Sequence, residues 1–146
     1  MRSTYRVLAF LVAACVAVQA AAIAMGFFGI IHEMEDGGAI TSSYDWEGNL
    51  GVMIHRYNGS LIALLVIALL VVSFFTRAPG AVRWAAALFG LVLLQFALLF
   101  PAFAVGPTWG GLHGLNALLI LGTALQAGRR ITRVQSDERV LDTAPV

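Results

Sequence analysis

The sequence predicts an all-α integral membrane protein, in which a bundle of four helices runs up, down, up and down. Of its 146 residues, 60% are hydrophobic and only 12% are charged, whereas soluble domains carry about 25% charged residues. Four apolar stretches approach or exceed the ~20 residues that cross a bilayer. They cover residues 7–31, 52–75, 84–105 and 111–128. We expect one transmembrane domain, 1–133, followed by a polar cytoplasmic tail, 134–146.

The first apolar stretch, 7–31, follows Arg2 and Arg6 and contains small residues near Ala20, as secretory signal peptides do. The apolar run continues well past these alanines, beyond the ~7–15 residues of a signal core. We therefore expect a membrane helix here. The only cysteine of the chain, Cys15, lies within it and is expected to be a small packing residue.

The links between the apolar stretches differ in length. Residues 33–51 form the longest one, whose glycines and hydroxyl side chains favour an irregular loop. Its aromatic pair, Tyr44 and Trp46, suits the level of the lipid headgroups. Residues 76–80 combine proline with glycine in a tight turn, and residues 101–111 join the last two helices.

Arginine supplies every basic side chain, because the chain contains no lysine. All arginines except Arg56 fall at the N-terminus, near the 76–80 turn or after the last apolar stretch, and the topology places these segments on one side. By the positive-inside rule, that side and both termini are cytoplasmic. We expect a multi-pass protein of the bacterial cytoplasmic (inner) membrane in contact with the lipid bilayer. No basic aromatic face for nucleic acid is found.

A polar motif opens the second and fourth apolar stretches. His55 is followed at a spacing of three by Asn58, and His113 is followed at the same spacing by Asn116. On a helix this spacing puts the two side chains on one face, one turn apart. Ionisable residues inside a membrane are costly and are functional candidates by default.

The first and third apolar stretches each carry a glutamine near the middle, Gln19 and Gln95. We expect these glutamines to form hydrogen bonds between helices, and contact with a quinone is the alternative interpretation. Because each glutamine helix precedes a His-x-x-Asn helix, the pattern suggests an internal repeat of two hairpins, related by an axis along the membrane normal.

The matched depth of His55 and His113 favours metal or haem ligation. In a four-helix bundle the second and fourth helices are diagonal, on the order of 12–14 Å apart. Two inward-pointing imidazoles with an iron between them, each bond near ~2 Å, roughly span that gap. We therefore expect haem b with both histidines as axial ligands. The alternative is that each histidine, near water at a helix end, bonds a loop carbonyl.

Other residues would complete such a haem site. Arg56 is the only basic side chain on the outer side, and its planar fork suits a haem propionate. Asn58 and Asn116 would orient neighbouring groups or bond across helices. Glycines would leave room for the flat macrocycle, and they are Gly51, Gly59, Gly114 and Gly122. Aromatic side chains expected to pack against it are Phe27, Phe28, Phe96, Phe100 and Phe103.

His32 stands apart at the outer end of the first helix, beside Glu33. We expect it to form an interfacial polar contact, and the alternative is a third site residue, as a proton carrier or another ligand. Zinc is less favoured, because nearby acidic residues could supply oxygen ligands but no Cys or His-x-x-His cluster accompanies them.

The positions of the two histidines resemble a pattern of the haem A synthase family. Each four-helix half of that enzyme carries a histidine on its second and fourth helices, near the outer face, as His55-Arg56 and His113 do here. The resemblance implies a bis-histidine haem b bundle like the cofactor-binding half. It does not extend to haem A synthesis, because the enzyme has two halves and a glutamate shortly before its substrate-half histidine. Here Val52 is the third residue before His55, and the nearest acid is Glu47. Small, poorly characterised four-helix bacterial membrane proteins have a similar layout.

The expected function is electron transfer by a membrane haem b protein, or service as a haem-containing subunit. Its partner would be a larger membrane or respiratory complex, or a second copy in a homodimer. The alternative is a cofactor-free accessory or assembly subunit that packs against a larger membrane complex. A transporter or proton-conducting bundle would need acidic residues within the membrane, and the apolar stretches have none. Whether the protein is an enzyme is left open.

Overall fold

The structure is a computed structural model that describes the backbone of residues 1–143 and the side chains of residues 1–133. It contains five helical segments and, within the described residues, no strand, which confirms the all-α prediction. The segments are α1 (Arg2–Glu35), α2 (Leu50–Phe75), α3 (Ala81–Ala97), α4 (Leu99–Ala104) and α5 (Pro107–Thr143).

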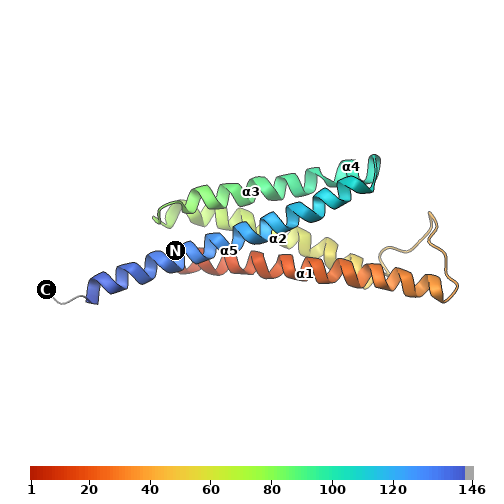
Figure 1. Ribbon diagram of the computed structural model, residues 1–146, viewed down its shortest axis with the longest axis horizontal. Coiled ribbons are helices and arrows are strands. Elements are labelled where there is room, and N and C mark those ends of the chain that lie inside the picture. Colours follow the sequence, from red (N-terminus) through yellow and green to blue (C-terminus); the bar gives the residue numbers. More distant parts are fainter. Residues whose placement is uncertain (144–146) are drawn as a thin grey trace.

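The helices form an antiparallel four-helix bundle in which α3 and α4 together take the place of one helix (Figure 1). α1 packs against α2 and α5, and α3 packs against the same two helices. α1 and α3 are therefore diagonal, as are α2 and α5. The start of α1 lies beside the later part of α5, at what we call the termini end, and the long loop 36–49 and α4 lie at the opposite, loop end (Figure 1).

Two helices extend beyond their predicted bounds. α1 covers Arg2–Glu35 instead of 7–31, and α5 covers Pro107–Thr143 instead of 111–128. The apolar pattern predicts only the part of a helix that lies in lipid. After Gly128 the chain continues to Thr143 with helix-forming polar residues and without Gly or Pro, so α5 continues. Most of the predicted tail is thus part of α5, and its last residues, 144–146, lie outside the described residues.

The predicted third helix, 84–105, is divided in two. α3 ends at Ala97 and α4 begins at Leu99. Pro101 has no backbone N–H, so the carbonyl of Ala97 lacks its usual i+4 donor and the helix is interrupted there. The backbone N–H of Ala102 bonds the carbonyl of Leu98 at 3.2 Å, which carries the chain across the interruption.

Within the described part of the chain, three helical segments are long and apolar enough to cross a membrane: Arg2–Glu35, Leu50–Phe75 and Ala81–Ala104. Large apolar side chains such as Leu64 and Phe75 are exposed on the bundle surface, where lipid suits them better than water. The protein is therefore a membrane protein in a lipid bilayer. That α5 also crosses the membrane, and that both termini are cytoplasmic, stay predictions.

The hydrophobic core lies toward the termini end. Its largest completely buried side chains are Tyr5, Val12, Val66, Leu69, Leu88 and Ile131. The hydroxyl of Tyr5 donates a hydrogen bond of 3.0 Å to the carbonyl of Ala81, across the diagonal between α1 and α3. This bond satisfies the polar atom of a buried aromatic residue and ties the two hairpins together.

Helices α1 and α2 touch through glycines nearer the loop end. A side chain added at Gly51 would overlap the backbone of Gly26 and meet the carbonyl of Ala22. Beside this crossing, the Oδ1 of Asn49 accepts from the N–H of Val52 at 3.1 Å and so caps α2. Its Nδ2 donates to the carbonyl of Gly26 at 3.0 Å. One asparagine therefore starts α2 and binds it to α1.

Candidate functional site

The structure brings His55 and His113 together inside the bundle. Their ring centres are 6.4 Å apart and the ring planes are inclined by 49°. His55 comes from α2 and His113 from α5, the diagonal pair of helices, so the rings meet between the two hairpins. Both residues are partly buried.

Each imidazole is held by a backbone carbonyl of the neighbouring helix. The Nδ1 of His113 lies 3.0 Å from the carbonyl oxygen of Gln95, and the Nδ1 of His55 lies 3.3 Å from that of Gln19. A carbonyl oxygen can only accept, so Nδ1 carries the hydrogen in each neutral ring and Nε2 keeps its lone pair. Metal-binding histidines are oriented by this kind of second hydrogen bond. The partners are helical carbonyls, not the loop carbonyls of the alternative interpretation.

Asn58 and Gln19 complete the first polar cluster, which we call the α1–α2 cluster (Gln19, His55 and Asn58). The Nδ2 of Asn58 donates to the Oε1 of Gln19 at 3.0 Å and to the carbonyl of Cys15 at 2.8 Å. The prediction of hydrogen bonds between helices is confirmed for this pair. Cys15 contributes its backbone here, and its side chain is a free thiol.

Gln95, His113 and Asn116 form the second cluster, which we call the α3–α5 cluster. The Nδ2 of Asn116 donates to the Oε1 of Gln95 at 2.6 Å and to the carbonyl of Leu91 at 2.9 Å. In addition, the Nε2 of Gln95 donates to the carbonyl of His113 at 3.1 Å. The predicted bonds between helices are confirmed here as well.

The two clusters share one hydrogen-bond pattern. In both, the asparagine bonds the glutamine side chain and the carbonyl four residues before that glutamine, and the histidine bonds the glutamine carbonyl. A symmetric two-hairpin repeat of the whole fold stays a prediction. The clusters differ in burial, because Asn116 is only 3% exposed. Its Oδ1 is buried and has no partner among the described residues, which costs about 1–3 kcal/mol.

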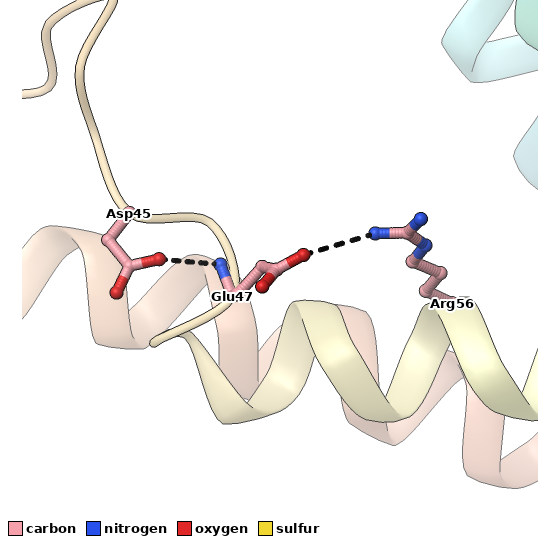
Figure 2. A network of polar contacts seen from close by, with 3 residues as sticks. All are labelled: Asp45, Glu47 and Arg56. Atoms are coloured by element: carbon pink, nitrogen blue, oxygen red, sulfur yellow. Dashed lines mark hydrogen bonds and ion pairs between the residues drawn. The ribbon is translucent and has the colours of Figure 1, made fainter.

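Arg56 lies outside both clusters, although it follows His55 in the chain. Its Nη1 is 3.9 Å from the Oε1 of Glu47, and the two side chains are 69% and 78% exposed (Figure 2). Figure 2 also shows Asp45, whose Oδ1 accepts from the N–H of Glu47 at 3.1 Å and so shapes the end of the loop. An exposed ion pair of this length is weak.

The four glycines of the expected haem site have different surroundings. A side chain at Gly59 would lie 3.1 Å from the Nε2 of Gln19, a tight contact with the end of a flexible side chain. Gly51 is required by its contact with Gly26. Gly114 and Gly122 face open space. Packing between α1 and α2 thus accounts for Gly51 without a macrocycle.

His32 is not brought to the other histidines. It is exposed at the end of α1, and its Nε2 lies 3.7 Å from the Oδ2 of Asp36 one turn later, which fits the expected interfacial polar contact. Among the described residues, no group of three or more His, Cys, Asp or Glu side chains could hold a metal ion, so the zinc interpretation gains no support. The expected aromatic partners Phe27, Phe28, Phe96, Phe100 and Phe103 are all exposed.

Asn49 and the carbonyls of Cys15 and Leu91 are structural partners that sequence reasoning missed. A signal for Asn49 was present, since asparagine just before a helical apolar run is a preferred N-cap. No comparable signal marks the two carbonyls, because every residue has one.

Comparison with known proteins connects part of the chain to a family. Residues 51–102 match the model of a family described as a family of unknown function (DUF6220). The match begins in α2 and ends within α4, and so includes His55 and Gln95 but not His113. It covers less than half of the chain. The fold and this match together fit a small, largely apolar helical membrane protein.

No curated protein and no solved structure matches the chain. The comparisons therefore add no link to haem A synthase, and that resemblance stays a prediction.

Proposed function

We propose that this protein binds haem b within the membrane, with His55 and His113 as the two axial ligands. The observation that carries the proposal is the 6.4 Å between the two ring centres, on helices that face each other diagonally. Two imidazoles on opposite sides of one iron, each bonded at about 2 Å, have ring centres roughly 6 Å apart. The distance between the two ring centres therefore supports this pair of ligands.

The protonation pattern supports the same proposal. With Nδ1 donating to a backbone carbonyl, each ring keeps on Nε2 the lone pair that an iron ligand needs. A porphyrin supplies the other four nitrogen ligands, so two histidines suffice and no third protein ligand is needed. Zinc, in contrast, takes three or four protein ligands.

The loop end of the bundle is the part that would receive the macrocycle. There α4 packs against α3 and α5 but against neither α1 nor α2, so the two hairpins diverge toward this end (Figure 1). Exposed aromatic side chains, including Phe96 and Phe103, belong to the diverging segments. Arg56 would hold a propionate after leaving its weak contact with Glu47.

A haem held by two histidines supplies one-electron chemistry. The chain's own residues would orient the ligands and exclude water, and the helices would hold the site in the bilayer. We infer a role in electron transfer or as a haem-containing subunit of a membrane complex, such as a respiratory one, in the bacterial inner membrane. The partner would be that complex or a second copy of the chain.

An absorption spectrum of the purified protein, expressed with ample haem, tests the proposal. We expect a Soret band for the wild-type protein and its loss in His55→Ala and in His113→Ala. His32→Ala is the matched control, because it removes an exposed histidine outside the site and should keep the full haem content.

Absence of a Soret band in the wild-type protein, or full haem content in His55→Ala, would overturn the proposal. A protein that carries no haem, copurifies with a larger membrane complex and tolerates His113→Ala would instead be a cofactor-free accessory or assembly subunit.

A further inference from the structure

We propose that Gln95 and Asn116 are positioning residues for His113, because they clamp α5 in one register against α3. The inference rests on the proposed function for the identity of the ligand that His113 would bind, but the clamp itself is a property of this chain. The two amide side chains would fix the position of the imidazole along the axis of α5 and its rotation about that axis.

The clamp is built from one residue of α3 and two residues of α5 one turn apart. The Oε1 of Gln95 accepts from Asn116 at 2.6 Å, and the Nε2 of Gln95 donates to the carbonyl of His113 at 3.1 Å. The backbone carbonyl of Gln95 receives the Nδ1–H of His113 at 3.0 Å. Gln95 therefore forms hydrogen bonds to both ends of one turn of α5 and to the imidazole itself.

Such a grip determines where the imidazole points. Each helical residue adds 1.5 Å of rise and about 100° of rotation. A slip of α5 by one residue would therefore turn His113 away from His55. Two attachment points one turn apart oppose both the translation and the rotation, which a single bond would not do.

Fully buried apolar side chains are sparse at the level of His113. The buried core residues of α3 end at Val92, and those of α5 begin at Ile120, so the core lies on the termini side of the clamp. The glycines of α5 near the site, such as Gly114, face open space and make no close contact between helices. The amide clamp supplies the hydrogen bonds between α3 and α5 beside the imidazole.

The α1–α2 cluster provides an internal comparison. There the Gly26–Gly51 crossing and the bond from Asn49 to Gly26 also hold the two helices together on the loop side of His55. Gln19 is thus supported by a close backbone crossing, whereas the glycines of α3 and α5 near Gln95 make none. Replacing Gln95 should disturb His113 more than replacing Gln19 disturbs His55.

The test replaces Gln95 by methionine, which keeps the length of the side chain and removes its hydrogen bonds. Gln126→Met is the matched control, because Gln126 is an exposed residue of α5. The first measurement uses haem-free protein labelled with ¹⁵N-histidine. We expect nuclear magnetic resonance to show His113 protonated at Nδ1 in the wild-type protein and in Gln126→Met, and a mixture of tautomers in Gln95→Met.

The second measurement uses haem-loaded protein and electron paramagnetic resonance. Gln95→Met should convert part of the low-spin signal to a high-spin signal at unchanged haem content. Gln95→Glu keeps the Oε1 acceptor and should recover part of the low-spin signal. If Gln95→Met does not fold, Asn116→Ala takes its place and should give the same tautomer mixture.

A single Nδ1–H tautomer of His113 in every folded Gln95 and Asn116 variant would overturn the inference. Because this readout needs no haem, it separates the clamp from the proposed function. A wild-type protein without a Soret band contradicts the function, and an unchanged tautomer contradicts the clamp.

Discussion

His55 and His113 lie with their ring centres 6.4 Å apart, although the backbones of their helices, α2 and α5, do not pack against each other. Each ring is positioned from the side, by the neighbouring helix of its own hairpin. The relationship between the two residues therefore depends on contacts between α1 and α2, on contacts between α3 and α5, and on the packing of one hairpin against the other.

The Gly26–Gly51 contact predicts that Gly51→Ala is destabilising. Alanine would gain about 0.5–1 kcal/mol in helix propensity over glycine, but overpacking a tight contact costs about 1–3 kcal/mol, and here the clash is with backbone. We expect a net loss of stability, measured by thermal unfolding in detergent. Gly90→Ala is the control, because Gly90 faces open space and should gain stability. Equal melting temperatures for the two variants would contradict the close contact.

Asn49 has two separable tasks, and Asn49→Asp distinguishes them. Aspartate keeps the oxygen that caps α2 but loses the Nδ2 donor to the carbonyl of Gly26. We expect Asn49→Asp to be intermediate in stability between the wild-type protein and Asn49→Ala, which also loses a cap worth about 1 kcal/mol. Denaturation curves of the three proteins check the order, and an Asp variant as unstable as the Ala variant would show that capping contributes little.

Tyr5→Phe removes the hydroxyl that bonds the carbonyl of Ala81 between diagonal helices. A net hydrogen bond contributes about 1 kcal/mol, so the free energy of unfolding should fall by about that amount. Tyr57→Phe is the matched control, because Tyr57 is exposed and its change should leave stability unaltered. Unfolding of both variants in detergent provides the measurement, and an equal loss in both would argue against the buried bond.

Arg56→Gln separates the weak ion pair from the proposed propionate contact. The pair with Glu47 is exposed and long, so the free energy of unfolding should change by less than about 1 kcal/mol. Haem binding should weaken by about 10- to 100-fold, since a charge-assisted hydrogen bond contributes about 1.5–3 kcal/mol. Haem titration measures this change. Glu47→Gln is the control, and it should not weaken haem binding, because it frees Arg56.

Residue types and spacing were sufficient to predict the class of fold and the presence of amide hydrogen bonds between helices. Four apolar stretches indicated the bundle, and amides in apolar helices indicated bonds between helices, which Gln19–Asn58 and Gln95–Asn116 form. These predictions succeed because an unpaired polar group in lipid is costly, so its side chain must find a partner nearby.

The surroundings of the glycines and the ends of the helices were harder to predict. Gly51 and Gly59 were expected to leave room for a ligand, but their neighbours are Gly26 and Gln19. A glycine shows that space is needed without showing what fills it. Pro101 was taken as the start of a link, but it divides α3 from α4 within one helical path, because a missing N–H can interrupt a helix without ending it.

The two clusters have a consequence for how the protein assembles. The hydrogen bonds of each cluster join helices of one hairpin, α1 with α2 or α3 with α5, and none of them crosses between hairpins. With α5 crossing the membrane as predicted, each hairpin can insert into the bilayer and orient its own histidine before it meets the other. The pairing of His55 with His113 then becomes a late docking event between two preformed halves, as in two-stage assembly of membrane helices.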